Sequence, residues 1–157
     1  MFKLKIICLG KFKEKAFIDL EKEYLKRLRL YAKITIEELK EVSYKTTGDI
    51  ERARAEEAET VLRRIPKDAI IIVLDEKGVT RGSVDFSQFL SRLISINREI
   101  VCVIGSGAGI DKSLRQAANH LVSLSPLTFT HNFARVLLEE QIYRACTIME
   151  GKEYHKD

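Results

Sequence analysis

The stretch EIVCVIGSGAGID, residues 99–111, decides how this chain is expected to fold. Ile100–Ile104 is a short, uninterrupted apolar run, which is typical of a parallel strand covered on both faces. Asp111 is placed to cap a following helix. The loop between the strand and this helix contains three alternating glycines: Gly105, Gly107 and Gly109. Such a pattern indicates a backbone that takes positive φ and approaches a ligand closely.

The glycine spacing argues against a dinucleotide-binding site. It is GxGxG rather than GxGxxG, and too little chain follows for the further βαβ units and the distal acidic residue that such a site uses. A plain tight turn would explain one glycine better than three. A loop that binds another kind of ligand is therefore the interpretation we favour.

Alternating strands and helices predict an α/β protein with a mainly parallel sheet and helices on both faces. Ala69–Asp75 is a continuous β-branched run, as expected of a central strand. Because ligands bind outside the carboxyl ends of such strands, Leu74 and the glycine loop can share one ligand. The expected strands are Phe2–Cys8, Ile34–Ile36, Ala69–Asp75, Ile100–Ile104 and Val122–Ser125. The expected helices are Glu14–Tyr31, Ile50–Ile65, Asp85–Asn97, Asp111–Asn119 and Phe133–Met149, with a loop at Glu41–Asp49.

Composition restricts the class of protein further. A chain of 157 residues with 45% hydrophobic and 32% charged residues fits a single domain, 1–157, and contains no apolar run near the length of a membrane span. Lys3 and Lys5 interrupt the first apolar stretch, so it is too short for a signal peptide, and a cytoplasmic protein is expected. The net charge of +4 favours encounter with a polyanion without establishing nucleic-acid binding.

The cysteines and the last helix make two further predictions. Cys8, Cys102 and Cys146 lie in apolar runs at wide spacing, so buried reduced thiols are expected, without a disulfide or a metal site. Apolar residues spread around much of the helix Phe133–Met149, more widely than one core-facing stripe requires. Either this helix is fully buried in a monomer, or it also forms a homodimer interface.

Four motifs extend the glycine loop into a larger pattern: IGSGAGI (104–110), VSLSPLTFTH (122–131), ARVLLEEQIYRA (134–145) and YHK (154–156). Together they resemble the RlmH family of the SPOUT superfamily, and the resemblance runs essentially end to end. It implies a homodimer with a trefoil-knotted C-terminal half that binds S-adenosylmethionine and methylates N3 of a pseudouridine in 23S rRNA of the large ribosomal subunit. This chain departs from the family pattern at Gly105-Ser106, where Gly-Gly is usual, and at Thr130, where proline usually precedes the histidine.

The resemblance also implies which residues form the site. On the substrate side it indicates Arg144, Tyr154, His155 and Lys156, with stacking, proton acceptance and phosphate attraction as their roles. Simpler interpretations remain open: Arg144 can pair with Glu140, and terminal residues are often disordered. On the cofactor side the implied residues are Leu74, Gly105, Gly107, Leu124, Ser125, Pro126, Leu127, Thr128 and Phe129.

Three functions follow from these patterns. The leading one is an RNA methyltransferase. The second is a non-catalytic RNA- or ribosome-binding module that keeps the fold and the basic surface. The third is a nucleotide-binding oxidoreductase that uses the glycine loop for a dinucleotide. Binding of S-adenosylmethionine or NAD, and methyl incorporation into ribosomes, would separate them.

Overall fold

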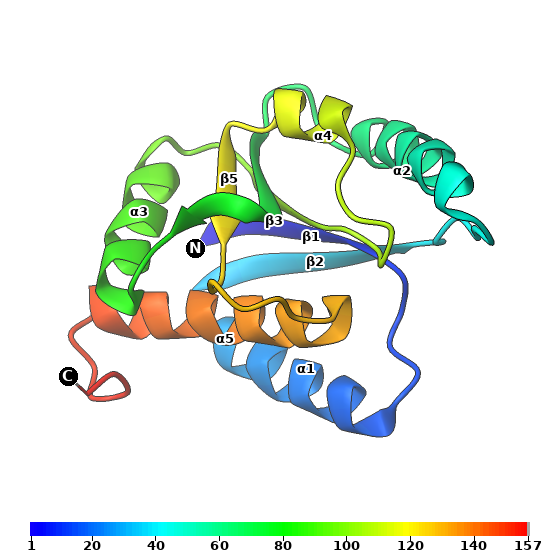
Figure 1. Ribbon diagram of the computed structural model, residues 1–157. Helices are drawn as coiled ribbons and strands as arrows, with labels where there is room; N and C mark the ends of the chain where they lie inside the picture. The colour runs from blue at the N-terminus through cyan, green and yellow to red at the C-terminus, as the bar shows by residue number, and fades with distance from the viewer. Residues whose placement is uncertain (157) are drawn as a thin grey trace.

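In the computed structural model, which describes residues 1–156, five strands form one sheet in the order β2-β1-β4-β3-β5, and all neighbours are parallel (Figure 1). The predicted α/β class with a parallel sheet is therefore confirmed. The strands are β1 Phe2–Leu9, β2 Ala32–Leu39, β3 Ile70–Thr80, β4 Ile100–Ile104 and β5 His120–Ser123. The helices are α1 Lys15–Leu28, α2 Thr47–Leu62, α3 Ser83–Ser95, α4 Lys112–Ala117 and α5 His131–Met149.

Strand β4 shows why its sequence is apolar throughout. Ile100, Cys102 and Ile104 point into a core shared with α1, α3 and α5, and alternate residues point to the other face. There Val101 and Val103 join a second core with residues of α2 and α4. Figure 1 shows these two helical layers on opposite sides of the sheet. All five residues of β4 are buried, as expected for a central strand with no solvent-facing side.

Helix α2 begins three residues earlier than the sequence analysis predicted. The Thr46 hydroxyl accepts a hydrogen bond from the Asp49 backbone N–H, and the Asp49 carboxylate accepts one from the Thr46 backbone N–H. This capping box satisfies donors that the first turn would otherwise leave unpaired. The loop expected at Glu41–Asp49 is therefore too long at its end.

The end of β3 differs most from the prediction. The strand continues past Asp75 to Thr80, and Val122 of β5 pairs with both Leu74 and Val79. A Cβ atom on Gly78 would stand 2.6 Å from the Val122 backbone nitrogen, so only glycine allows this approach. In Figure 1 the end of β3 curves across β5. The predicted strand ended at Asp75 because the next residues, Glu76, Lys77 and Gly78, are two charged residues and a glycine, which are not typical of a strand.

Helix α5 packs against both α1 and α3, which accounts for much of its wide apolar surface. Its first turn nevertheless leaves Phe133 54% exposed, and its last residue, Met149, is 39% exposed. Cys8, Cys102 and Cys146 are buried free thiols, as predicted. Among the helices of residues 1–156, none is long and apolar enough to cross a membrane. The same residues contain no His, Cys, Asp or Glu cluster able to hold a metal ion.

Candidate active site

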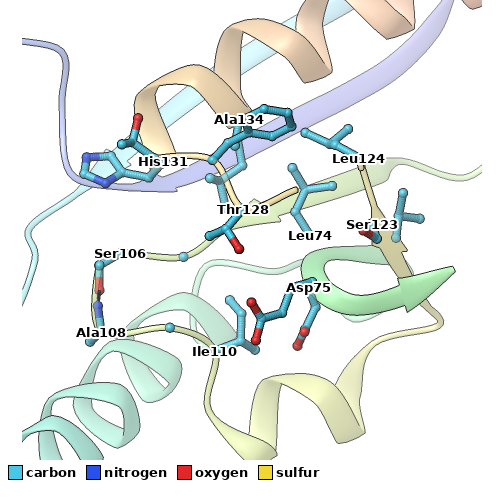
Figure 2. A pocket seen from close by; sticks show the side chains of 18 of the residues that line it. Leu74, Asp75, Ser106, Ala108, Ile110, Ser123, Leu124, Thr128, His131 and Ala134 are labelled. Atoms are coloured by element: carbon cyan, nitrogen blue, oxygen red, sulfur yellow. Dashed lines mark hydrogen bonds between the residues drawn. The ribbon is translucent and has the colours of Figure 1, made fainter. Parts of the chain in front are cut away.

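A cavity of about 500 Å³ opens where the carboxyl ends of β3, β4 and β5 meet (Figure 2). Its wall combines Leu74 and Asp75 at the bend of β3, the glycine loop Gly105–Ile110, and the segment from Ser123 to His131 that leads into α5. The three loops that the sequence predicted to converge do lie together. The volume falls in the range of roughly 300–1,000 Å³ that is usual for small-molecule sites.

Eight of the nine residues predicted on the cofactor side line this cavity, and Pro126 does not. The cavity is also lined by Arg54 and Arg115, which sequence reasoning missed. Neither arginine belongs to a recognisable motif, and Arg54 lies 54 residues from its contact in the glycine loop. The eight predicted residues are Leu74, Gly105, Gly107, Leu124, Ser125, Leu127, Thr128 and Phe129.

The three glycines of the loop differ in what they allow. Gly109 has φ of +89°, a conformation that side chains other than glycine adopt at a cost. Gly105 has no positive φ, but a Cβ there would stand 2.6 Å from Ile110 Cδ1, so close packing requires it. Gly107 has neither constraint, since its nearest neighbour would be the Tyr44 hydroxyl at 3.6 Å. The prediction of positive φ is thus right for Gly109 only.

Helix α2 supports the glycine loop through a buried carboxylate. Glu57 is 1% exposed and accepts hydrogen bonds from the Ser106 hydroxyl at 2.7 Å and the Val42 backbone N–H at 2.9 Å. The Ser106 hydroxyl oxygen also accepts from the Ala108 backbone N–H at 3.1 Å. Ser106 therefore forms a hydrogen-bonded link between α2 and the loop.

An ion pair between Asp75 and Arg115 fixes the bend of β3. The Asp75 carboxylate accepts from Arg115 Nε at 2.5 Å and from the Lys77 backbone N–H at 2.9 Å, and its side chain is only 2% exposed. Arg115 belongs to α4, which begins after Asp111; the Asp111 carboxylate accepts from the Ser113 backbone N–H at 2.8 Å. Asp111 therefore caps this helix, as predicted. The pairing neutralises two of the charges in the cavity wall.

The segment between β5 and α5 holds its shape through its own hydroxyl groups. The Ser123 hydroxyl donates to the Ser125 carbonyl at 2.8 Å, and the Ser125 hydroxyl oxygen accepts from the Leu127 backbone N–H at 3.0 Å. Thr130 caps α5, since its hydroxyl oxygen accepts from the Phe133 N–H. Leu127 remains 72% exposed at the cavity rim. The segment is thus ordered while it still offers apolar surface.

The tail residues form a separate cluster at the far end of α5. Tyr154 donates its hydroxyl hydrogen to Glu140 Oε1 at 3.1 Å, and its ring packs edge-on against Tyr143. Arg144 pairs with Glu140, and its guanidinium lies 4.8 Å from the centre of the Tyr154 ring. Arg144 Nη1 lies 3.2 Å from His155 Nδ1. The expected Arg144–Glu140 ion pair is therefore present, and the alternative of a disordered tail is wrong for Tyr154 and His155.

Burial and the charge of Glu140 raise the pKa of Tyr154 to about 12. Tyr154 is thus a neutral phenol near pH 7 and is unsuited to accept a proton. Arg144 is a cation whose pKa is raised further by its hydrogen bond to Glu140. Lys156 is exposed, and Asp157 lies outside the described residues. Of the predicted substrate-side residues, His155 is the one whose neutral side chain has a ring nitrogen that can accept a proton.

The cavity and the tail cluster lie apart in the single chain. His131, at the start of α5, lines the cavity, whereas Arg144 lies more than three turns further along the same helix. At 1.5 Å per residue this separates their backbones by about 20 Å. The structure therefore does not bring the predicted cofactor-side and substrate-side residues together within one copy.

A third polar group lies between α1, α5 and β2, outside both regions. Arg135 is 3% exposed and pairs with Glu21 and with Glu38, the latter at 2.7 Å. Glu139 is fully buried, with Oε1 3.8 Å from Arg135 Nε and no hydrogen-bond partner for either oxygen among the described residues. Burial, followed by the charge of Glu21, raises the pKa of Glu139 to about 9. The i, i+4 spacing of Arg135 and Glu139 would by itself indicate only a simple pair, whereas the structure joins Glu21 and Glu38 to it.

Comparison with known proteins gives a consistent result over almost the whole chain. Residues 2–155 match the family described as "Predicted SPOUT methyltransferase". A protein of Caldicellulosiruptor saccharolyticus named ribosomal RNA large subunit methyltransferase H is 39% identical, and the match covers 98% of this chain and 99% of that one. A protein of the same name from Pseudothermotoga lettingae is also 39% identical with the same coverage, and one from Listeria monocytogenes is 34% identical over 98% of this chain and 99% of its own.

Proposed function

Because the chain belongs to the SPOUT methyltransferase family, we propose that it transfers a methyl group from S-adenosylmethionine to N3 of a pseudouridine in 23S rRNA of the large ribosomal subunit. The observation that carries this proposal is the cavity at the meeting point of three strand-end loops, in a chain whose full-length relatives are named as large-subunit rRNA methyltransferases. We also propose a cytoplasmic location, because the proposed substrate is ribosomal RNA.

The cavity fits this methyl donor in size and in chemistry. S-adenosylmethionine has an adenosine portion and an amino-acid portion, and a volume of about 500 Å³ can hold both. Leu74, Leu124 and Phe129 supply apolar walls suited to adenine, while Gly105 and Gly107 allow the loop backbone to approach closely. Ser125, Pro126, Leu127 and Thr128 complete the proposed donor-binding set.

The sulfonium of the bound donor supplies an electrophilic methyl group, so the remaining task is to make N3 of the base nucleophilic. N3 reacts as it loses its proton, and His155 is the proposed acceptor of that proton. Tyr154 offers a ring on which an unstacked base can lie. Arg144 and Lys156 supply positive charge for a phosphate or for negative charge that develops on the uracil ring.

A trefoil knot is part of the proposal, and the contacts of β3 support it. Val122 pairs with Leu74 before the bend and with Val79 after it, with Gly78 lying against the backbone between them. This close contact between β5 and the curved end of β3 is the arrangement that we expect of a threaded chain. Threaded chains are rare, and the hydrophobic pattern of the sequence does not predict one. The contact between β3 and β5 is therefore the main structural support for the proposed knot.

We further propose that the enzyme works as a homodimer in which the tail of one copy completes the cavity of the other. The separation of about 20 Å within one chain supports this, because N3 must reach both the methyl group and the proton acceptor. Exposed apolar side chains at the cavity rim and the start of α5 support it as well. They are Leu127, Phe129 and Phe133.

The activity is tested by incubating the protein and labelled S-adenosylmethionine with ribosomes and with protein-free rRNA that both lack the modification. Methyl incorporation at one pseudouridine is expected. Binding of ribosomes without incorporation would instead indicate a non-catalytic RNA-binding module. Calorimetric binding of NAD in preference to S-adenosylmethionine would favour an oxidoreductase.

Mixing two inactive variants tests the shared site. One variant carries Gly107→Val in the cavity and the other carries His155→Ala in the tail. If each site uses both copies, a mixed dimer contains one intact site, and mixing should recover up to about half the activity per mixed dimer. No recovery after verified exchange of subunits would show that each copy acts alone.

A further inference from the structure

The two arginines of the cavity wall differ in the contacts that they make within the protein. Arg115 is paired with the buried Asp75, and the pair leaves no net charge. Arg54 lines the same cavity from α2 and is half-buried. Its Nε donates to the Ala108 carbonyl, whereas its two terminal nitrogens have no acceptor among residues 1–156. Arg54 is therefore a cation held against the cavity with most of its donors unused.

The position of this guanidinium is fixed by the loop that it contacts. The bond from Nε to the Ala108 carbonyl leaves both terminal nitrogens of the guanidinium available as donors. A Cβ on Gly109 would stand 3.3 Å from Arg54 Nη2 and 3.4 Å from Nε, so glycine leaves room for the group. One helical turn further along α2, Glu57 holds Ser106 of the same loop. Helix α2 therefore holds the Arg54 guanidinium in a defined position beside the glycine loop.

We propose that Arg54 binds the carboxylate of the methyl donor's amino-acid portion. This inference rests on the proposed function and adds the residue that sets the orientation of the donor. Two terminal nitrogens of a guanidinium match two carboxylate oxygens, and such charge-assisted pairs are stronger than neutral hydrogen bonds. The donor's carboxylate is its only anionic group, and Arg54 is the lining cation that is not already neutralised by a carboxylate.

Such an anchor determines where the methyl group lies. With the carboxylate at Arg54 and the adenine against the apolar walls, the donor is held at both ends, and the sulfonium between them has little freedom. The backbone loops alone would bind adenosine without fixing the amino-acid portion. Arg54 is thus a binding and positioning residue, and the anion that it serves is a carboxylate of a small molecule rather than an RNA phosphate.

The test compares S-adenosylmethionine with its decarboxylated analogue by calorimetry on the intact protein. The wild type should bind the complete donor about tenfold to a hundredfold more tightly than the analogue. Arg54→Gln keeps an amide that can donate to the Ala108 carbonyl but has no charge. It should bind both ligands with the weak affinity that the wild type shows for the analogue. Arg54→Lys should recover part of the preference.

Arg52→Ala is the matched control, because it removes an arginine of the same helix whose side chain is 63% exposed and absent from the cavity wall. It should keep the full preference for the carboxylate. A preference that persists in Arg54→Gln would overturn the inference. Equal weakening of both ligands would also overturn it, since the loop and not the carboxylate would then depend on Arg54.

Two further results distinguish this inference from an RNA-binding role for Arg54 and from failure of the proposed donor site. If Arg54→Gln leaves both donor affinities unchanged but raises the KM for ribosomes, Arg54 contacts an RNA phosphate and the inference is wrong. If the wild type binds neither adenosyl ligand, the proposed donor site itself fails, and the inference falls with it.

Discussion

The cavity and the tail cluster stand at opposite ends of α5 and are built in opposite ways. The cavity is lined largely by loops that helices behind them hold in place. Glu57 of α2 accepts a hydrogen bond from Ser106, and Arg115 of α4 forms an ion pair with Asp75. The tail is held by side chains that satisfy one another, with Glu140 bonded to both Arg144 and Tyr154. The cavity is therefore ready for a ligand, whereas the tail must release contacts before its groups can act on a substrate.

The contact between Arg144 and His155 is one that the tail would have to release, because it occupies a ring nitrogen of the proposed proton acceptor. A guanidinium has only donors, so His155 Nδ1 must be the acceptor at 3.2 Å. A neutral ring in this arrangement carries its proton on Nε2. To take the N3 proton as proposed, His155 must either exchange tautomer, which frees Nε2, or separate from Arg144, which frees Nδ1. We expect substrate RNA, by drawing Arg144 to a phosphate, to bring about that change.

Deleting Tyr154–Asp157 should have the largest effect on activity. Methyl transfer should fall by about 10³-fold or more because the proton acceptor and the stacking ring are lost together. Donor affinity should stay within about twofold of the wild type, since the cavity is built without the tail. Single-turnover rates and calorimetry on the same preparation measure the two quantities.

His155→Ala is the finer version of that deletion. It should lower the single-turnover rate by about 10²-fold and leave RNA binding nearly unchanged, with part of the loss recovered at higher pH. A normal rate across the pH range would assign the tail to RNA positioning alone.

Gly107→Val should produce the converse effect at the cavity. The structure leaves room for the Cβ atom, whose nearest contact would be the Tyr44 hydroxyl at 3.6 Å, so the protein should fold. The branched side chain should obstruct the cavity and weaken donor binding by about 10²-fold. Circular dichroism verifies the fold, and calorimetry gives the affinity. Unchanged affinity would remove Gly107 from the donor site.

Glu139→Leu should change stability rather than either site. The raised pKa means that the folded state binds this proton more tightly than the unfolded state, so the stabilising effect is complete below about pH 4.5 and declines as the pH rises to about 9. Replacing the unpaired carboxyl by leucine should raise the free energy of unfolding near pH 8 by about 1–3 kcal/mol. Denaturant titrations between pH 5 and pH 9 should show a smaller pH dependence in the variant.

Ser106→Gly should give the smallest effect and tests whether support from α2 matters to the cavity. It removes two hydrogen bonds of the Ser106 hydroxyl: the one donated to Glu57 and the one accepted from the Ala108 backbone N–H. Donor affinity should weaken by about threefold to tenfold, since one hydrogen bond to a charged group is lost while Glu57 keeps its bond to Val42. An affinity equal to that of the wild type would show that the loop holds its shape without this link.

The sequence predicted those features that local patterns control. The limits of β4 and the cap at Asp111 follow from apolar periodicity and a polar residue before a helix, and both are correct. The start of α2 was also readable, since Thr46 and Asp49 have capping-box spacing. The prediction missed it because residues 41–49 are mostly polar and have no apolar residues at helical spacing.

Long-range contacts limited the prediction elsewhere. The pairing of Val79 with Val122 and the contact of Arg54 with Ala108 join segments far apart in the chain, and no local pattern encodes them. The donor-side residues came from the family resemblance, and Arg54, which the structure places in the same cavity wall, is the residue that we propose to add to them. The order of the motifs did not predict that the tail lies away from the cavity. The two motifs precede and follow the same helix, α5, and the length of that helix separates them in space.

The crossing of β3 over β5 has a consequence for the order in which the chain can fold. The β3–β5 edge includes a contact 48 residues apart in sequence, between Ile71 and Asn119, and β5 lies against a bend that only Gly78 permits. Closing such a long loop is slow compared with forming a helix. The residues after β5 are made last by the ribosome, so the cavity is the final part to assemble. A newly made chain should thus acquire its helices and the β1–β2 pair well before it can bind a ligand.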